Sequence, residues 1–128
     1  MPRSADVDDA ISRVTRSRAD ALLVTPNPSM LARRVQIAEH AIREKLPTIF
    51  DAEPHVTAGG LMSYSADRPT MHRRAAAFAD KILRGTQAGT IAIEEPTKYR
   101  LAINMRTAKA LGLTIPPSLL LRADQVIE

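Results

Sequence analysis

The sequence predicts an α/β fold built on an open, mostly parallel sheet flanked by helices. Short apolar runs alternate along the chain with longer amphipathic segments, which is the rhythm of βα units joined by right-handed crossovers. The run at 21–25 is apolar until its last residue, as expected for a strand buried on both faces of a parallel sheet. With 128 residues the chain has about the length of one domain, so we expect one compact domain overall.

The first element is a helix over residues 5–18, in which Val7 and Ile11 recur at helical spacing. Ser4 can cap this helix, and Asp6 in its first turn suits the positive end of the helix dipole. The later elements follow from apolar runs, cap residues and breakers in the same way. They are a strand at 21–25, a helix at 30–45 capped by Ser29, a strand at 48–50, a loop at 52–60, a strand at 61–64, a helix at 69–84, a strand at 99–103, a short helix at 107–111 and a helical turn after 116.

The helix at 69–84 is the longest that the sequence predicts. Its apolar residues recur at helical spacing and include Met71, Phe78 and Ile82, which are expected to form a buried face. Asp67 or Thr70 can cap its start.

The charge balance is basic, with 18 Lys and Arg against 14 Asp and Glu and an isoelectric point near 10.0. A basic excess can indicate a nucleic-acid partner. Here the basic residues are dispersed, and only 3% of residues are aromatic, so few rings could stack on bases. We expect no nucleic-acid partner, and a salt-dependent gel shift is the test that would reinstate one.

Motifs of covalent chemistry and metal binding are missing from the sequence. There is no cysteine, no G-x-S-x-G, no G-x-G-x-x-G and no P-loop, and the glycine pair at 59–60 is interpreted as a flexible entry into the next strand. His40, His55 and His72 lack the spacing of a chelate and are expected to be exposed to solvent. The sequence therefore predicts no catalytic residue, no metal site, no cofactor and no enzyme activity.

Polar residues follow three predicted strands, at the point where each strand ends. Ligands of open α/β sheets gather beyond the carboxyl ends of the strands, so these residues are expected to converge on one rim and to hydrogen-bond a small polar ligand. Each also has a structural interpretation, because such residues hold turns, cap helices and end strands. The candidate ligand-binding residues are Asn27, Asp51, Tyr64, Ser65 and Asp67.

The carboxyl-terminal half carries a more specific signal, in residues 79–85, 95–104 and 107–128. These segments resemble the carboxyl end of the substrate-binding proteins of bacterial ABC transporters, which have the type I periplasmic-binding-protein fold. Residues 18–24 and 59–64 fit the same family. The resemblance runs from about residue 5 to the end of the chain.

The resemblance implies a two-lobed receptor that closes on a small polar solute, such as an amino acid, and delivers it to the permease subunits of an ABC importer. Residues 1–66 would then supply βα units of the carboxyl-terminal lobe. Residues 67–98 would supply a crossover helix and linker that pack on the amino-terminal lobe. Residues 99–128 would supply the returning strand and the last helical turns. The resemblance also implies that the candidate ligand-binding residues face the cleft between the lobes.

The sequence departs from the family at its beginning. It starts in the middle of the second lobe, so we interpret it as a truncated member or as one whose start codon was assigned too far downstream. Family members are periplasmic, whereas the chain as written has no signal peptide and is expected to be cytoplasmic. Without its usual packing surface, the helix at 69–84 is expected to expose an apolar face and to allow self-association.

A stand-alone α/β module of the flavodoxin-like or receiver-like type, acting through protein contacts and without catalysis, is the alternative. A receiver needs clustered acidic residues at the end of its first strand, where this sequence has Pro-Asn-Pro at 26–28. A compact monomer with sharp cooperative unfolding would favour this alternative.

Overall fold

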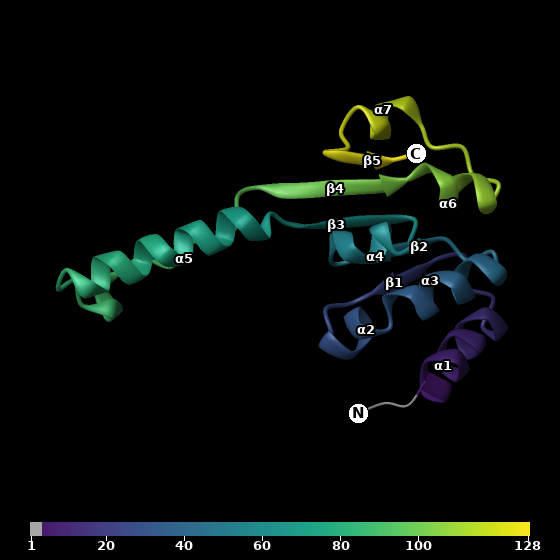
Figure 1. The fold of residues 1–128 in the computed structure, drawn as a ribbon, viewed down its shortest axis with the longest axis horizontal. Helices are drawn as coiled ribbons and strands as arrows, with labels where there is room; N and C mark the ends of the chain where they lie inside the picture. The colour runs from purple at the N-terminus through teal and green to yellow at the C-terminus, as the bar shows by residue number, and fades with distance from the viewer. Residues whose placement is uncertain (1–3) are drawn as a thin grey trace. The chain divides into compact units, whose positions relative to one another are not determined.

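A computed structural model describes residues 4–128, except for the side chains of residues 4–6 and of Thr15 (Figure 1). The predicted capping by Ser4 and the dipole contact of Asp6 lie outside the described side chains. The elements are α1 (Ser4–Arg16), β1 (Leu22–Val24), α2 (Pro28–Ala32), α3 (Arg34–Arg43), β2 (Thr48–Phe50), α4 (Glu53–Thr57), β3 (Met62–Ala66), α5 (Arg68–Leu83), the 3-10 turn η1 (Ala88–Thr90), β4 (Tyr99–Asn104), α6 (Met105–Ala110), α7 (Pro117–Leu120) and β5 (Gln125–Ile127).

The strands form one five-stranded sheet in the order β1-β2-β3-β4-β5. β1, β2 and β3 are mutually parallel, and β4 is parallel to β5. The backbone N–H of Asn104 donates to the carbonyl of Leu61 over 2.8 Å, so the carboxyl end of β4 lies beside the amino end of β3 and these two strands run in opposite directions. The predicted open, mostly parallel α/β sheet is confirmed.

The chain divides into two compact units. The first unit is Met1–Ser65 with Arg100–Glu128, and the second unit is Ala66–Tyr99. None of the helices described in residues 4–128 combines the length and the apolar character needed to cross a lipid bilayer.

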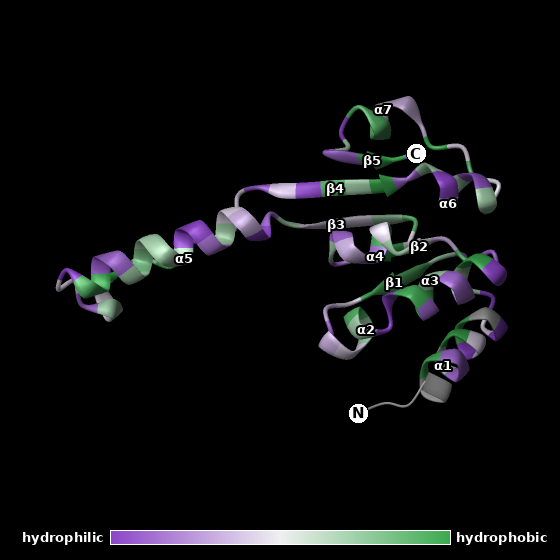
Figure 2. Ribbon diagram, viewed as in Figure 1, coloured by the Kyte–Doolittle hydropathy of each residue, from purple (hydrophilic) through white to green (hydrophobic). Residues whose placement is uncertain are grey.

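One core of the first unit lies where α1 and α3 cover β1 and β2. It contains Val7, Ile11, Val24, Ile37 and Phe50, each less than one-tenth exposed. Figure 2 shows β1 as mainly hydrophobic along its length.

The prediction that the first strand is buried on both faces is wrong for its middle residue. Leu23 is 67% exposed, whereas Val24 is buried in the core. β1 is an edge strand, and successive side chains of a strand point to opposite faces, so only one of its faces meets the α1–α3 layer.

A second core of the first unit joins β4 to the helical turns that follow it. Leu61, Leu101, Ile103, Ala108 and Ile115 are its buried members. Asn104 caps α6 by accepting a hydrogen bond from the backbone N–H of Thr107, which satisfies one of the donors left open at a helix start. The strand and short helix predicted here are confirmed, and β5 is an additional strand that the sequence did not indicate.

Three local predictions in the first half of the chain are corrected. The helix expected at 30–45 is two helices, α2 and α3, which meet at Arg33. The cap of α2 is Asn27 rather than Ser29, because the Asn27 side chain accepts from the backbone N–H of Ser29. The expected loop at 52–60 contains the helix α4.

The second unit consists of α5 and the chain that follows it. The buried face predicted for α5 from its periodicity is wrong, because α5 has no buried residue. The exposed apolar face expected from the family resemblance is found, since Met71 and Ile82 are 43% and 45% exposed. The Arg74 guanidinium donates to the Glu94 carboxylate and thereby lowers the pKa of Glu94 below its ordinary value, although both groups are at the surface. A carboxyl pKa lowered in the folded chain stabilises at neutral pH, and that contribution disappears as the pH falls through the lowered pKa.

Candidate ligand-binding site

The carboxyl ends of β1, β2 and β3 form one edge of the sheet in the first unit. The register aligns Val24 with Phe50 and Phe50 with Ser63, so these residues form one row across three strands. All three are less than one-tenth exposed. The next residues along the strands, which mark the beginning of the polar rim, are Thr25, Asp51 and Tyr64.

Asn27 lies just beyond β1 and is exposed. Its Oδ1 accepts a hydrogen bond of 2.8 Å from the backbone N–H of Ser29, and Pro28 occupies the first turn of α2. The structural interpretation of Asn27 as a turn and cap residue is therefore realised, and one of its side-chain atoms is already engaged.

Asp51 follows the last residue of β2, and α4 begins two residues later. This short helix brings His55 back toward the strand, so its ring stacks on Phe50 with centroids 4.5 Å apart and planes 10° from parallel. The His55 Nε2 lies 3.8 Å from the Asp51 Oδ1, and the Asp51 side chain is 17% exposed. Asp51 is thus a half-buried carboxylate beside a buried imidazole.

Histidine exposure was predicted wrongly for two of the three histidines. His55 is 1% exposed and His40 is 6% exposed, whereas His72 is exposed as expected. His55 is buried because residues predicted to form a loop form α4, which turns the imidazole onto Phe50.

Tyr64 and Ser65 are neighbours in β3, so their side chains point to opposite faces of the sheet. Tyr64 is 57% exposed, and Ser65 is half-buried. Of these two residues, the phenol of Tyr64 offers the larger surface, both apolar and hydrogen-bonding, to a partner at the rim.

Asp67 belongs to the second unit and is 5% exposed. It occupies the N-cap position of α5, but its carboxylate accepts from the Thr70 hydroxyl over 2.8 Å rather than from a backbone N–H. The Lys98 Nζ lies 3.5 Å away. Asp67 lines a hollow of about 690 Å³ within the second unit, together with apolar residues of α5 such as Met71 and Phe78.

Two polar residues at the same edge of the first unit were not singled out from the sequence. Arg100, at the start of β4, places its Nη1 3.8 Å from the Glu53 Oε2. The Gln125 amide, oriented so that its NH2 donates, lies 2.6 Å from the Glu53 Oε1. Because β4 runs against β3, the beginnings of β4 and β5 join the ends of the first three strands, which sequence order alone did not indicate.

The edge of the first unit therefore offers carboxylates, hydroxyls and a guanidinium, which suit hydrogen bonding and ion pairing with a small polar molecule. Among the described side chains, no group of three or more His, Asp or Glu is arranged to hold a metal ion.

Comparison with known proteins shows extensive similarity. The sequence model of the ABC transporter substrate binding protein family matches residues 1–127. A protein of Clostridioides difficile (strain R20291) described as a tyrosine-binding protein is 26% identical over 110 residues, which are 86% of this chain and 32% of that protein.

Solved structures with the same fold include a conserved domain protein from Vibrio cholerae, with a TM-score of 0.85 and 25% identity over 97% of this chain and 42% of that one. Another is a Streptococcus pneumonia ABC domain in complex with L-Trp, with a TM-score of 0.86 and 24% identity over 99% of this chain and 43% of that one. The chain thus spans about a third to two fifths of the length of these relatives.

Proposed function

This chain belongs to the family of ABC transporter substrate binding proteins, and from that premise we propose that it contributes to binding a small polar solute, such as an amino acid, for a bacterial ABC importer. The observation that carries the proposal is the family match over residues 1–127. Because relatives of this chain bind tyrosine and L-Trp, the first candidate ligands are aromatic amino acids.

The chemistry of the rim suits such a ligand. An amino acid presents an ammonium group, which needs hydrogen-bond acceptors, and a carboxylate, which needs donors. Asp51 supplies a half-buried acceptor, and Tyr64 and Ser65 supply hydroxyl donors at the same edge of the first unit. Asn27 adds a polar side chain at the end of the neighbouring strand, and Asp67 remains a candidate from the second unit. Binding by these groups needs no covalent step, in keeping with a family whose members are generally not catalysts.

We also propose the lobe assignment made from the sequence. Residues 1–66 would belong to the carboxyl-terminal lobe, 67–98 to a crossover toward the other lobe, and 99–128 to the return. Since the chain spans 42–43% of the solved relatives, its rim would form one wall of the cleft. Binding by the 128-residue chain alone is then expected to be weak, and tight binding by this chain alone would refute the one-wall assignment.

The partners proposed for the whole protein are the solute and the permease subunits of an ABC importer, in the periplasmic or extracellular setting typical of family members. The uncovered apolar residues of α5 are proposed to allow self-association of the chain. The family match favours this interpretation over a stand-alone flavodoxin-like or receiver-like module.

Thermal-shift screening tests the function. The sample is the protein from the longest reading frame that contains this sequence, and the ligands are the common amino acids tested one at a time. A true ligand at roughly 100 times its Kd stabilises by about 2.7 kcal/mol, so a clear rise in Tm is expected for tyrosine, tryptophan or another amino acid. No rise in Tm with any amino acid would contradict the proposal.

A further inference from the structure

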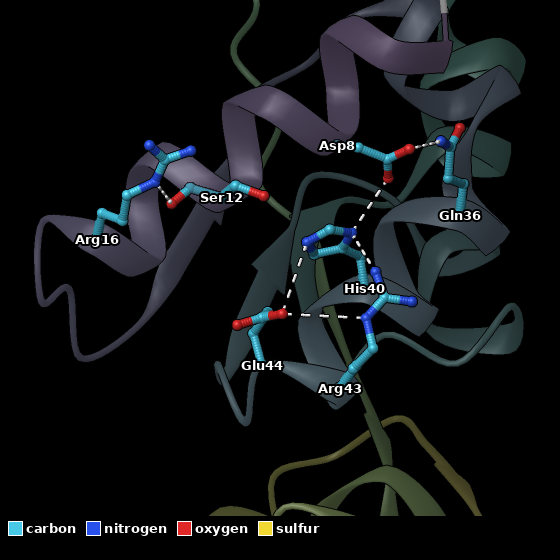
Figure 3. A network of polar contacts seen from close by, with 7 residues as sticks. All are labelled: Asp8, Ser12, Arg16, Gln36, His40, Arg43 and Glu44. Atoms are coloured by element: carbon cyan, nitrogen blue, oxygen red, sulfur yellow. Dashed lines mark hydrogen bonds and ion pairs between the residues drawn. The ribbon is translucent and has the colours of Figure 1, made fainter.

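A cluster of polar side chains in the first unit links α1 to α3 around the buried ring of His40 (Figure 3). The His40 Nδ1 lies 3.1 Å from the Asp8 Oδ1, which comes from α1. The same nitrogen lies 2.6 Å from the Nη2 of Arg43, one turn further along α3. On the other side of the ring, Nε2 lies 4.0 Å from the Glu44 Oε1.

One ring nitrogen cannot satisfy both neighbours at once. The Arg43 guanidinium only donates, so it needs a lone pair on Nδ1. The Asp8 carboxylate at neutral pH only accepts, so it needs a proton on Nδ1. The protonation state of His40 therefore decides which of the two partners is bonded.

We propose that His40 is a proton-controlled selector of partners between α1 and α3. In the neutral ring the proton sits on Nε2, facing Glu44, and Nδ1 accepts from Arg43. When the ring takes a second proton from solvent, Nδ1–H donates to Asp8 and Nε2–H faces Glu44, while Arg43 is released. The hydrogen bond from His40 on α3 to Asp8 on α1 is thus made by the protonated ring.

The surroundings supply a second partner for Asp8 and a second partner for Arg43. The second oxygen of Asp8 accepts from the Gln36 Nε2 over 3.1 Å. Asp8 therefore stays in place when the His40 Nδ1 accepts from Arg43 and no longer donates to Asp8. The Arg43 Nε lies 3.9 Å from the Glu44 Oε1, which holds the guanidinium when the ring no longer accepts from it. Arg43 is also 65% exposed, so its release into water costs little.

The charged groups that face the ring come from two elements. α1 contributes Asp8, and the end of α3 contributes Arg43 and Glu44. Arg16 on α1 is directed to the backbone carbonyl of Ser12, and among the described residues α2 and α4, which also pack on α3, make no hydrogen bond or ion pair with the ring. Among the described side chains, the ring is thus flanked by the carboxylates of Asp8 and Glu44 and by the guanidinium of Arg43.

The hydrogen bond from His40 to Asp8 is one of several interactions that hold α1 on α3. Val7 and Ile11 of α1 pack in the same core as Ile37 of α3, and these apolar side chains carry no titratable group. A charge-assisted hydrogen bond is about twice as strong as a neutral one. Protonation of the ring is therefore expected to hold α1 more firmly on α3.

The tautomer of His40 tests the selector directly. Imidazole 15N chemical shifts at about pH 8 should show the proton on Nε2 in the wild-type chain and on Nδ1 in Arg43→Met, because Asp8 then has no competitor. Arg13→Met is the matched control, since this exposed arginine pairs with Asp9 on α1 and not with the His40 ring. The same tautomer in the wild type and in Arg43→Met would overturn the proposal.

Amide hydrogen exchange tests the consequence for α1. After correction for intrinsic exchange rates, protection of α1 should rise about five-fold between about pH 8 and about pH 5.5 in the wild type, as expected when the protonated ring adds a charge-assisted hydrogen bond from α3 to α1. His40→Asn, which cannot take up the proton, should abolish this rise. Equal pH dependence in the two proteins would contradict the proposed link between α1 and α3.

Discussion

At the scale of single residues, Gly60 allows the close packing next to Phe50, the residue that precedes Asp51 of the candidate rim. Gly60 has no side chain, and the space that a side chain would need is occupied by the Phe50 ring and the carbonyl of His55. Gly60 also donates its backbone N–H to that carbonyl over 2.8 Å. Gly60, which was interpreted as part of a flexible entry, is therefore a tightly packed position, because the chain closely approaches the Phe50 ring and the His55 backbone there.

Gly60→Ala tests this packing. A Cβ at this position would lie 2.9 Å from the His55 carbonyl and would collide with Phe50, so the rings or the backbone must shift. We expect the free energy of unfolding to fall by about 1–3 kcal/mol, the usual cost of overpacking a core. Urea denaturation followed by circular dichroism measures it.

Gly89→Ala is the control for Gly60→Ala. A Cβ at Gly89 meets no atom within 4 Å, so the free energy of unfolding should stay within about 0.5 kcal/mol of the wild type. An equal effect of the two substitutions would show that Gly60 is not held by its neighbours.

At the scale of elements, α5 is the longest of the described helices. It is sixteen residues long yet has no buried residue, and large apolar side chains such as Leu83 are 87% exposed. Cation–π contacts of Arg74 and Lys81 with Phe78, each with 5.8 Å between the charged atom and the ring centroid, cover only part of one aromatic ring. The apolar residues of α5 recur at the spacing of a helix that packs against a neighbour, yet none of them is buried in the second unit.

Ile82→Lys therefore addresses the proposed self-association. Ile82 is 45% exposed, so the substitution should change the stability of the chain by less than about 0.5 kcal/mol. If α5 mediates association, a lysine at its apolar face should weaken dimer formation by about tenfold or more, as seen by sedimentation velocity. Ile93→Lys, which adds the same charge at a 98% exposed position outside α5, should leave association unchanged. A monomeric wild-type chain at all concentrations would refute the proposal.

At the scale of the whole molecule, the predictions from sequence succeeded where local pattern decides structure. The strand at 48–50 is found with its predicted bounds, because Pro47 and Asp51 delimit a short apolar run. α4 and β5 were missed for a tertiary reason, since short segments with little periodicity form elements only when the sheet and core hold them. The convergence of Arg100 and Gln125 on the rim was missed likewise, because strand direction in β4 depends on long-range pairing.

The five candidate ligand-binding residues were also predicted only as far as local sequence pattern allows. The polar ends of three strands could be predicted to share an edge, since parallel strands end together. The sequence could not show that the Asn27 Oδ1 accepts the capping hydrogen bond of α2. It also did not show that Tyr64 and Ser65 face opposite sides of the sheet, or that Asp67 belongs to the second unit. The ligand-facing role of all five residues remains a prediction.

Calorimetric titration of the protein from the longest reading frame tests the central claim that the carboxyl rim of the first unit binds the solute. It compares the wild type with Asp51→Asn and Asp20→Asn, using the amino acid that gives the largest rise in Tm. Asp20 is the matched control, because it is an exposed aspartate next to the amino end of β1, at the opposite edge of the sheet. Loss of a hydrogen bond to a charged group of the ligand should weaken binding by about 10- to 100-fold in Asp51→Asn and leave Asp20→Asn at the wild-type affinity. Equal affinity in all three proteins would contradict the account.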